Sequence, residues 1–323
     1  MLQKTITKVG GLMKWLITVW ISIGWLTAHA CEDAPRQYHK LNGYTHQYRV
    51  TGKGPLMFFP SPYWGVGSDL YLNTLAKHLS QKFTVVFYDV RGSGLSEGPS
   101  NIEGFKFEDY ASDLEALRKH FRAPRVYLAG HSAGGQIIID YAARYPDRVE
   151  RLLVFDSVLF QGSESYTSYQ QQWMQNVAVH QSWWHDFVRG SEALRGVNKE
   201  TSPEELVDLL ADVVQPHFYA YENYKTFVSQ WRQDPEKRVN VLAYLAFAGG
   251  QLRPDLRPTA RKVSAPTTIV VGAYDQATPV QEARLLHEAI HDSKLYVVSD
   301  AGHFPWIENP EGFWTFWDDI QPE

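Results

Sequence analysis

A serine between glycines, placed directly after a short apolar run, limits what this chain can fold into more than any other stretch. Residues 126–129 are apolar and have the length of a buried strand. Gly130-His131-Ser132-Ala133-Gly134 then fits the pattern G-x-S-x-G, and the apolar residues 137–139 and 141–143 continue with helical spacing. In the turn from a strand to a helix, this pattern marks a nucleophile that projects above a sheet edge. We therefore expect Ser132 to be the nucleophile and Ala133 N–H, at the helix N-terminus, to face a developing oxyanion.

Buried strands alternate with helical patterns on both sides of this serine. A parallel sheet with helices on both faces is the architecture that such alternation predicts. Residues 44–50 alternate like an antiparallel edge strand, and residues 32–42 are expected to be irregular. The expected buried strands are residues 56–59, 83–88, 126–129, 149–155, 266–272 and 294–298, and the expected helices are residues 69–79, 107–121, 280–290 and 310–320.

The alternation stops in the middle of the chain. Residues 157–262 contain several helical patterns and no convincing buried strand, so we interpret them as a helical cap inserted into an α/β core. The core then consists of residues 31–156 and 263–323.

Composition excludes several classes of function. The formal net charge is −5, which gives no reason to expect a nucleic-acid partner. Cys31 is the only cysteine, so neither an internal disulfide nor a cysteine metal site is possible. Residues 92–94 lack the third glycine of a dinucleotide loop. We therefore expect no metal and no cofactor.

The N-terminus has the order of charged, apolar and small residues that is typical of an export signal. Lysines precede an apolar run at residues 15–26, and the small residues Ala28 and Ala30 follow. This order predicts a signal peptide over residues 1–30, and hence a secreted or periplasmic protein. The alternative is an uncleaved membrane anchor.

A serine nucleophile needs a base beside it and an acid that orients the base. In this architecture the partners follow in the order serine, acid, histidine, each after a later strand. Asp275 follows the strand at 266–272, and His303 follows the last strand. The competing acids are Asp300 and Asp156, of which Asp156 is the stronger because it ends the strand after the serine helix. We expect Asp156 instead to begin the insertion.

Three stretches resemble one known family. They are residues 89–96 (DVRGSGLS), 130–135 (GHSAGG) and 302–310 (GHFPWIENP). With them the chain resembles the α/β-hydrolase superfamily over nearly its whole length after residue 30, and the proline iminopeptidase group most of all. The resemblance implies the α/β-hydrolase fold, no cofactor, and release of an N-terminal residue, preferably proline, from a short peptide.

The chain departs from that family in two places. Where the family has His-Gly-Gly-Pro-Gly, residues 60–65 read PSPYWG, and a proline has no N–H to donate to an oxyanion. Tyr63 N–H is the expected second donor, with Trp64 as the alternative and as a substrate contact. The cap acid that would hold a substrate amine has no clear match, and Glu222 is the first candidate, followed by Glu204 and Glu205.

The first expected substrate is a short peptide that loses its N-terminal residue, and the alternative is an ester or lactone of a small hydrophobic acid. A hypothesis of another class is an inactive α/β-hydrolase that acts as a binding protein. The sequence does not predict the oligomeric state.

Overall fold

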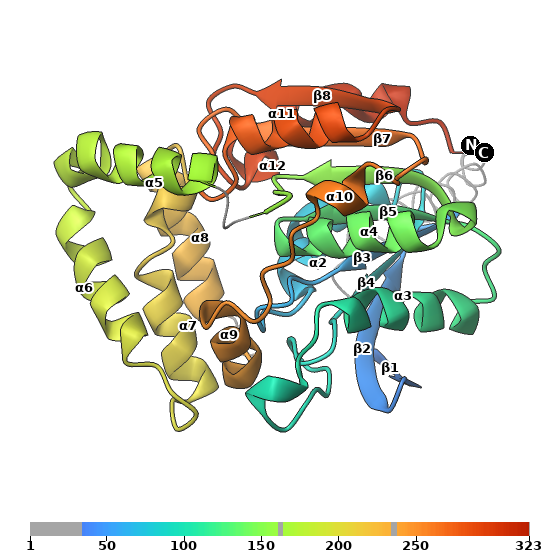
Figure 1. Cartoon of the computed structure of the whole chain (residues 1–323), viewed down its shortest axis with the longest axis horizontal. Coiled ribbons are helices and arrows are strands. Elements are labelled where there is room, and N and C mark those ends of the chain that lie inside the picture. The colour runs from blue at the N-terminus through green and yellow to red at the C-terminus, as the bar shows by residue number, and fades with distance from the viewer. Residues whose placement is uncertain (1–33, 161–163, 234–237, 323) are drawn as a thin grey trace, which may run out of the picture.

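The structure is a computed structural model, and it describes residues 34–160, 164–233 and 238–322. Its centre is an eight-stranded sheet in the order β1-β2-β4-β3-β5-β6-β7-β8 (Figure 1). β1 and β2 pair antiparallel at one edge, and every pairing from β4 to β8 is parallel. The mostly parallel sheet is therefore confirmed. The strands are β1 (Gln37–Leu41), β2 (Tyr44–Thr51), β3 (Leu56–Pro60), β4 (Thr84–Tyr88), β5 (Val126–His131), β6 (Val149–Phe155), β7 (Thr267–Gly272) and β8 (Ser293–Val298).

Residues 37–41 form a strand although an irregular segment was expected there. Their side chains are mostly polar and exposed, and only Leu41 is buried. An edge strand with one covered residue has no apolar alternation to reveal it, so its pairing with β2 decides its conformation.

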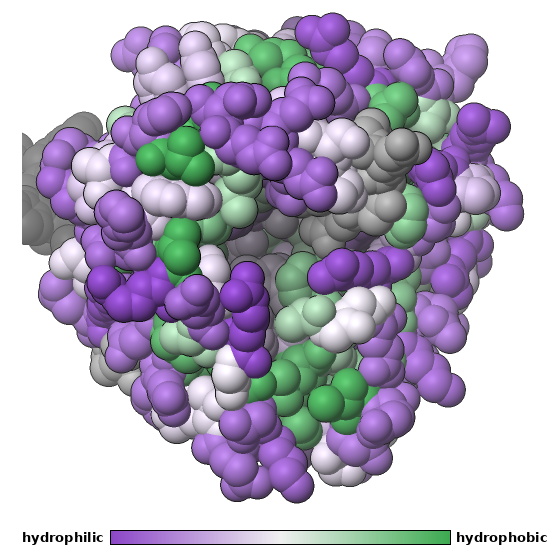
Figure 2. All heavy atoms as spheres, turned by 60° about the vertical axis from the view of Figure 1, so that its left-hand side comes forward, coloured by the Kyte–Doolittle hydropathy of each residue, from purple (hydrophilic) through white to green (hydrophobic). Residues whose placement is uncertain are grey.

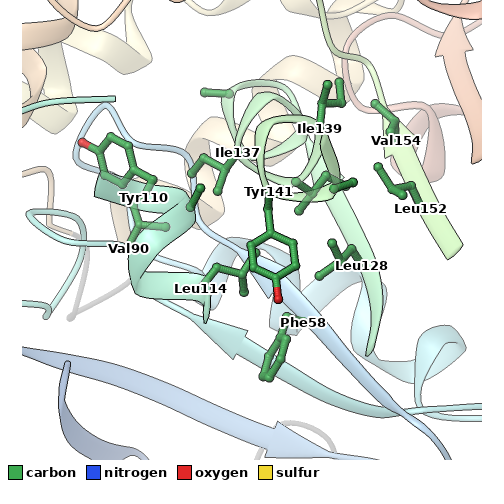
Figure 3. Packing of buried hydrophobic residues seen from close by; sticks show 14 of the residues in the cluster. Phe58, Val90, Tyr110, Leu114, Leu128, Ile137, Ile139, Tyr141, Leu152 and Val154 are labelled. Carbon is green, nitrogen blue, oxygen red and sulfur yellow. The ribbon is translucent and has the colours of Figure 1, made fainter. Parts of the chain in front are cut away.

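Helices cover both faces of the sheet because successive strand side chains point to opposite sides. Phe58 belongs to the cluster under α3, α4 and α11, whereas Phe59 belongs to the cluster under α2 and the C-terminal helices. Figure 3 shows the ring of Tyr141 of α4 between Leu114 of α3 and Leu128 of β5. These helices are α2 (Asp69–Leu79), α3 (Glu108–His120), α4 (Ala133–Arg144), α11 (Val280–Ala289), α12 (Pro305–Glu308) and α13 (Pro310–Phe313), with short 3₁₀ turns at η1 (Ile102–Gly104), η2 (Pro146–Arg148) and η5 (Trp314–Asp319).

The segment between β6 and β7 is helical, as expected, and α5 to α8 gather at one end of the molecule (Figure 1). Its last two helices pack differently, because Ala243 of α9 and Ala260 of α10 belong to the main core, where α9 lies against η1 and α10 against α4. The helices are α5 (Glu164–Asn176), η3 (Ala178–His180), α6 (Trp184–Arg195), α7 (Pro203–Ala211), η4 (Gln215–His217), α8 (Tyr221–Gln233), α9 (Val241–Ala248) and α10 (Arg257–Ala260). The division at residues 157 and 262 stays a prediction.

The predicted localisation requires a correction. The proposed leader, residues 1–30, lies outside the described residues. Among the residues that the structure describes, no helix has both the length and the apolar character needed to cross a membrane, and nothing in them is a positive sign of export. The prediction of an exported or membrane-anchored protein is therefore withdrawn, because it rested only on the order of charged, apolar and small residues in that leader.

A buried ion pair connects the turn after β4 to α3. Arg91 Nε and Nη2 donate to the two carboxylate oxygens of Asp113 at 2.6 and 2.7 Å, and Nη1 donates to Asp109 at 2.7 Å. Both Arg91 and Asp113 are buried. In the same turn, Ser93 Oγ donates to the carbonyl of Pro62 at 2.9 Å. The ion pair therefore supports the loop in which the second oxyanion donor is expected.

Replacing Asp113 tests this support. Asp113→Ala leaves the Arg91 charge buried with one partner fewer, and we expect the free energy of unfolding to fall by about 3 kcal/mol in urea denaturation. The control is Asp186→Ala, which breaks an exposed ion pair with Arg189 and is expected to change little. Similar losses in the two variants would contradict this role of the buried pair.

Candidate active site

The turn between β5 and α4 holds Ser132 in a strained backbone conformation. Its φ and ψ are 53° and −123°, a region that residues other than glycine rarely adopt. The strand and helix approach closely at the two glycines of the motif. A Cβ on Gly130 would lie 2.7 Å from the carbonyl oxygen of Gly134, and a Cβ on Gly134 would lie 2.9 Å from that of Pro60. The two positions therefore require glycine, because a larger side chain would clash with neighbouring backbone atoms.

An acid and a base lie together at the same edge of the sheet. Asp275 follows β7 and His303 follows β8, and His303 Nδ1 donates to Asp275 Oδ2 at 2.8 Å. Both side chains are buried. Burial alone would raise the pKa of Asp275, but His303 and hydrogen bonds from Thr278 hold it below its usual range. Asp275 is therefore a carboxylate that accepts a hydrogen bond from the imidazole of His303.

The loop carrying His303 is tied to the residue next to the serine. His131 Nε2 donates to the carbonyl of His303 at 2.8 Å, and its Nδ1 accepts from the Tyr71 hydroxyl at 3.0 Å. Burial lowers the pKa of His131 well below its usual value, so this ring is neutral. In the described part of the chain no hydrogen bond joins Ser132 Oγ to His303. Nucleophile–base bonds of this kind often tighten only when substrate is bound.

The expected oxyanion donors lie around the N-terminus of α4. Ala133 is the first residue of that helix, so its N–H has no acceptor within the helix. The Tyr63 side chain points away from any such role, because its hydroxyl donates to Gln136 Oε1 and its ring stacks on Tyr110 in the core. Trp64 is partly buried and packs against core residues. The donor roles of Tyr63 N–H and Trp64 N–H stay predictions.

The structure does not bring Glu222 to these groups. Its side chain is 80% exposed at the start of α8 and forms an ion pair with Lys225 at 2.6 Å. Glu204 and Glu205 are exposed in α7. The exposed positions of these three glutamates are those of ordinary surface residues on helices.

Two residues that hold the His303 loop had not been singled out. Glu308 accepts from the backbone N–H groups of Gly302, Ala220 and Tyr219 at 2.6, 3.0 and 3.2 Å. The carbonyl of His217 accepts from His303 N–H at 2.7 Å, and the two imidazole rings lie 5.2 Å apart. Glu308 lies within residues 302–310, and the family resemblance of that stretch was the one signal that could have identified it. No pattern in the sequence points to His217.

A cavity of about 520 Å³ lies beside this loop, between the first turn of α2, the turn after β4, and α8. One wall is formed by Phe227, whose ring packs on Phe304 at 5.0 Å, next to His303. The carboxylates lining the cavity already have partners: Asp69 pairs with two arginines, and Asp89 accepts from Ser68 and Leu95. Figure 2 shows that the face with the cap helices is hollowed near its centre and bordered by hydrophilic and hydrophobic residues.

One group of side chains could in principle hold a metal ion. Asp156, Asp275 and His303 each place a potential ligand atom within 4.8 Å of the other two. The Asp275 oxygen is already bonded to His303 and to the Thr278 hydroxyl, so acid–base pairing accounts for it. The expectation that the protein uses no metal and no cofactor stays a prediction.

Comparison with known proteins agrees with this geometry. A sequence model described as the alpha/beta hydrolase fold matches residues 59–310. The chain is 25% identical to a proline iminopeptidase of Saccharolobus solfataricus over 87% of this chain and 89% of the relative, and 23% identical to 3-oxoadipate enol-lactonase 2 of Acinetobacter baylyi over 73% and 78%. An enol-lactonase structure from Burkholderia xenovorans LB400 has a TM-score of 0.66 at 24% identity, covering 88% of this chain and 98% of that one. The resemblance to proline iminopeptidases is confirmed, and it is shared with lactonases.

Gly130→Ala tests the close approach at the turn. The new Cβ would meet only backbone atoms, at 2.7 to 3.0 Å, so strand and helix must move apart. We expect the free energy of unfolding to fall by about 1–3 kcal/mol and the labelling of Ser132 by a fluorophosphonate to slow. The control is Gly196→Ala at an exposed helix end, where φ is −83°. A Gly130→Ala variant labelled as fast as wild type would contradict the steric requirement.

His217 makes stability depend on pH. Burial, followed by the nearby His303, lowers its pKa from 6.5 to about 4. Between these pH values the unfolded chain binds a proton that the folded chain does not, so stability falls as pH drops from 6.5 to about 4. In His217→Phe we expect this fall to be smaller, measured as unfolding free energy in urea at pH 7 and pH 4.5. An equal fall in both proteins would refute the assignment.

Proposed function

Because this chain belongs to the alpha/beta hydrolase fold family, we propose that it is a serine hydrolase that cleaves small carboxylic esters or lactones through an acyl-enzyme. The observation that carries the proposal is the buried 2.8 Å bond between Asp275 and His303 at the edge where the strained turn presents Ser132. In this proposal Ser132 is the nucleophile, His303 the general base and acid, and Asp275 the group that orients His303.

The proposed reaction has two halves. Ser132 Oγ attacks the carbonyl carbon while His303 Nε2 takes its proton, and Asp275 stabilises the resulting imidazolium. The N–H of Ala133, with that of Tyr63 or Trp64, binds the oxyanion. His303 then protonates the departing alcohol, and a water molecule activated by the same histidine releases the acid from Ser132.

Two features favour an ester over the N-terminal amide of a peptide. An aminopeptidase needs a free carboxylate to hold the substrate ammonium, and the candidate Glu222 is exposed and paired with Lys225. Pro60 and Pro62 both lack an N–H, which reduces the donors that the loop can offer to an oxyanion. An amide places the greater demand on that stabilisation because its leaving group is poorer.

An aminopeptidase that releases an N-terminal proline is the second candidate. The observation in its favour is the 25% identity to a proline iminopeptidase over most of both chains. Aromatic residues of the cap, such as Trp173 and Trp183, whose rings lie 6.2 Å apart, suit a cyclic substrate without choosing between proline and a lactone.

The test compares p-nitrophenyl butyrate, γ-butyrolactone and proline p-nitroanilide as substrates. We expect turnover of the ester and lactone, little turnover of the anilide, and a loss of at least about 10³-fold in kcat in Ser132→Ala. Anilide turnover that disappears when the proline amine is blocked would establish the aminopeptidase instead. A folded wild-type protein that turns over none of the three and takes up no fluorophosphonate would support the binding-protein alternative.

A further inference from the structure

Asp156, the rejected candidate for the acid, occupies a buried and strained position beside the accepted one. It directly follows β6, its φ is 43°, and its side chain is fully buried. Its N–H donates to the carbonyl of Val270 at 2.9 Å, and its Oδ1 accepts from Gly272 N–H at 2.8 Å. Both bonds connect it to β7, the strand that leads to Asp275. A positive φ in a residue other than glycine requires such surrounding bonds to maintain it.

The second oxygen of Asp156 has an unusual environment. In the described part of the chain no donor reaches Oδ2, although this atom is buried. The Asp156 carboxyl group lies beside the carboxylate of Asp275, and potential ligand atoms of Asp156, Asp275 and His303 all lie within 4.8 Å of one another. A buried carboxylate oxygen facing a second carboxylate is costly in the charged form, because it lacks both water and a donor.

Two neighbouring buried carboxyl groups share a single negative charge, and their hydrogen bonds decide which one carries it. Asp275 accepts from Ala277 N–H, Thr278 N–H, the Thr278 hydroxyl and His303. Among the residues that the structure describes, Asp156 accepts only from Gly272 N–H. Burial, followed by the charge of Asp275, raises the pKa of Asp156 well above its usual value. The charge therefore resides on Asp275 and the proton on Asp156.

We propose that Asp156 is a positioning residue whose protonated carboxyl group donates a hydrogen bond from Oδ2 to Asp275. This proposal rests on the proposed function, in which Asp275 orients His303. The bond continues the series Ser132, His303, Asp275 by a fourth side chain. It holds the Asp275 carboxylate through a bond separate from the one to the imidazole. It also makes that carboxylate a weaker acceptor for the imidazole proton, so the proton stays on His303 Nδ1.

The proposal predicts that an amide can replace the acid at residue 156 and not at residue 275. In Asp156→Asn, the amide oxygen still accepts from Gly272 N–H and the amide N–H₂ still donates to Asp275. We expect kcat/KM for p-nitrophenyl butyrate within about threefold of wild type, with an unchanged pH profile. Asp156→Ala removes the donor and should lose roughly 10–100-fold, chiefly in kcat. Asp275→Asn should lose on the order of 10⁴-fold, because the imidazole is left in the wrong tautomer.

Asp140→Asn provides the matched control. Asp140 is also a buried acid, and it pairs with Arg144 further along α4. We expect its kcat/KM to be unchanged. An Asp156→Asn variant that loses as much activity as Asp275→Asn would show that Asp156 is the ionised acid, and an Asp156→Ala variant with wild-type kcat would show that it positions nothing. Either result overturns the proposal.

A spectroscopic measurement tests the proton itself without any substrate. In infrared spectra of wild type at pH 8, we expect the carbonyl stretch of a protonated carboxylic acid, absent from Asp156→Asn and present in Asp140→Asn. Absence of the band from wild type, or its persistence in Asp156→Asn, would refute the proposal even if Asp156→Ala does not fold. A wild-type protein that shows this band but has no hydrolase activity would refute the proposed function and leave the hydrogen bond established. The titratable groups around Asp156 are Asp275, from the turn after β7, His303, from the loop after β8, and Glu308, at the end of α12.

Discussion

The carboxylate of Asp275 is a negative charge buried at the carboxyl edge of the sheet, and its neighbours supply what water would otherwise provide. Burial penalises a charge unless donors replace the lost hydration. Here the turn after β7 offers two backbone N–H groups and a hydroxyl, and the loop after β8 offers His303. Because β6, β7 and β8 are neighbouring parallel strands, their ends bring Asp156, Asp275 and His303 together at one edge. The parallel order of the strands is thus the condition for the acid–base pair.

The same edge also holds the helical segment inserted after β6. Glu308 accepts hydrogen bonds from Gly302 on the His303 loop and from Tyr219 and Ala220 at the start of α8. His303 N–H itself donates to the carbonyl of His217 in that segment. A displacement of the start of α8 would therefore break bonds that fix the position of His303. The position of this helical segment and the orientation of His303 are physically connected in this protein.

Much of the architecture was predictable from local pattern. Apolar runs identified the central strands because a parallel strand is buried on both faces, and the glycines around Ser132 identified a turn that only small residues permit. The features that could not be predicted from the sequence have a common cause. The conformation of the polar strand β1 depends on its pairing with β2. The orientation of the Tyr63 side chain depends on the hydrogen bond from its hydroxyl to Gln136, and the exposure of Glu222 depends on how α8 packs. None of these contacts can be predicted from the residues next to them in the sequence.

The sequence by itself determined the strand–serine–helix turn and the order in which serine, acid and histidine follow successive strands, because both are properties of consecutive residues. It offered two acids for one role, since Asp156 and Asp275 each follow a strand directly. Only the tertiary structure distinguishes them, by the number of hydrogen-bond donors around each. Among the described residues, Asp275 accepts four hydrogen bonds and Asp156 accepts one. A buried carboxyl group is ionised where donors converge on it, and that convergence comes from segments far apart in the chain.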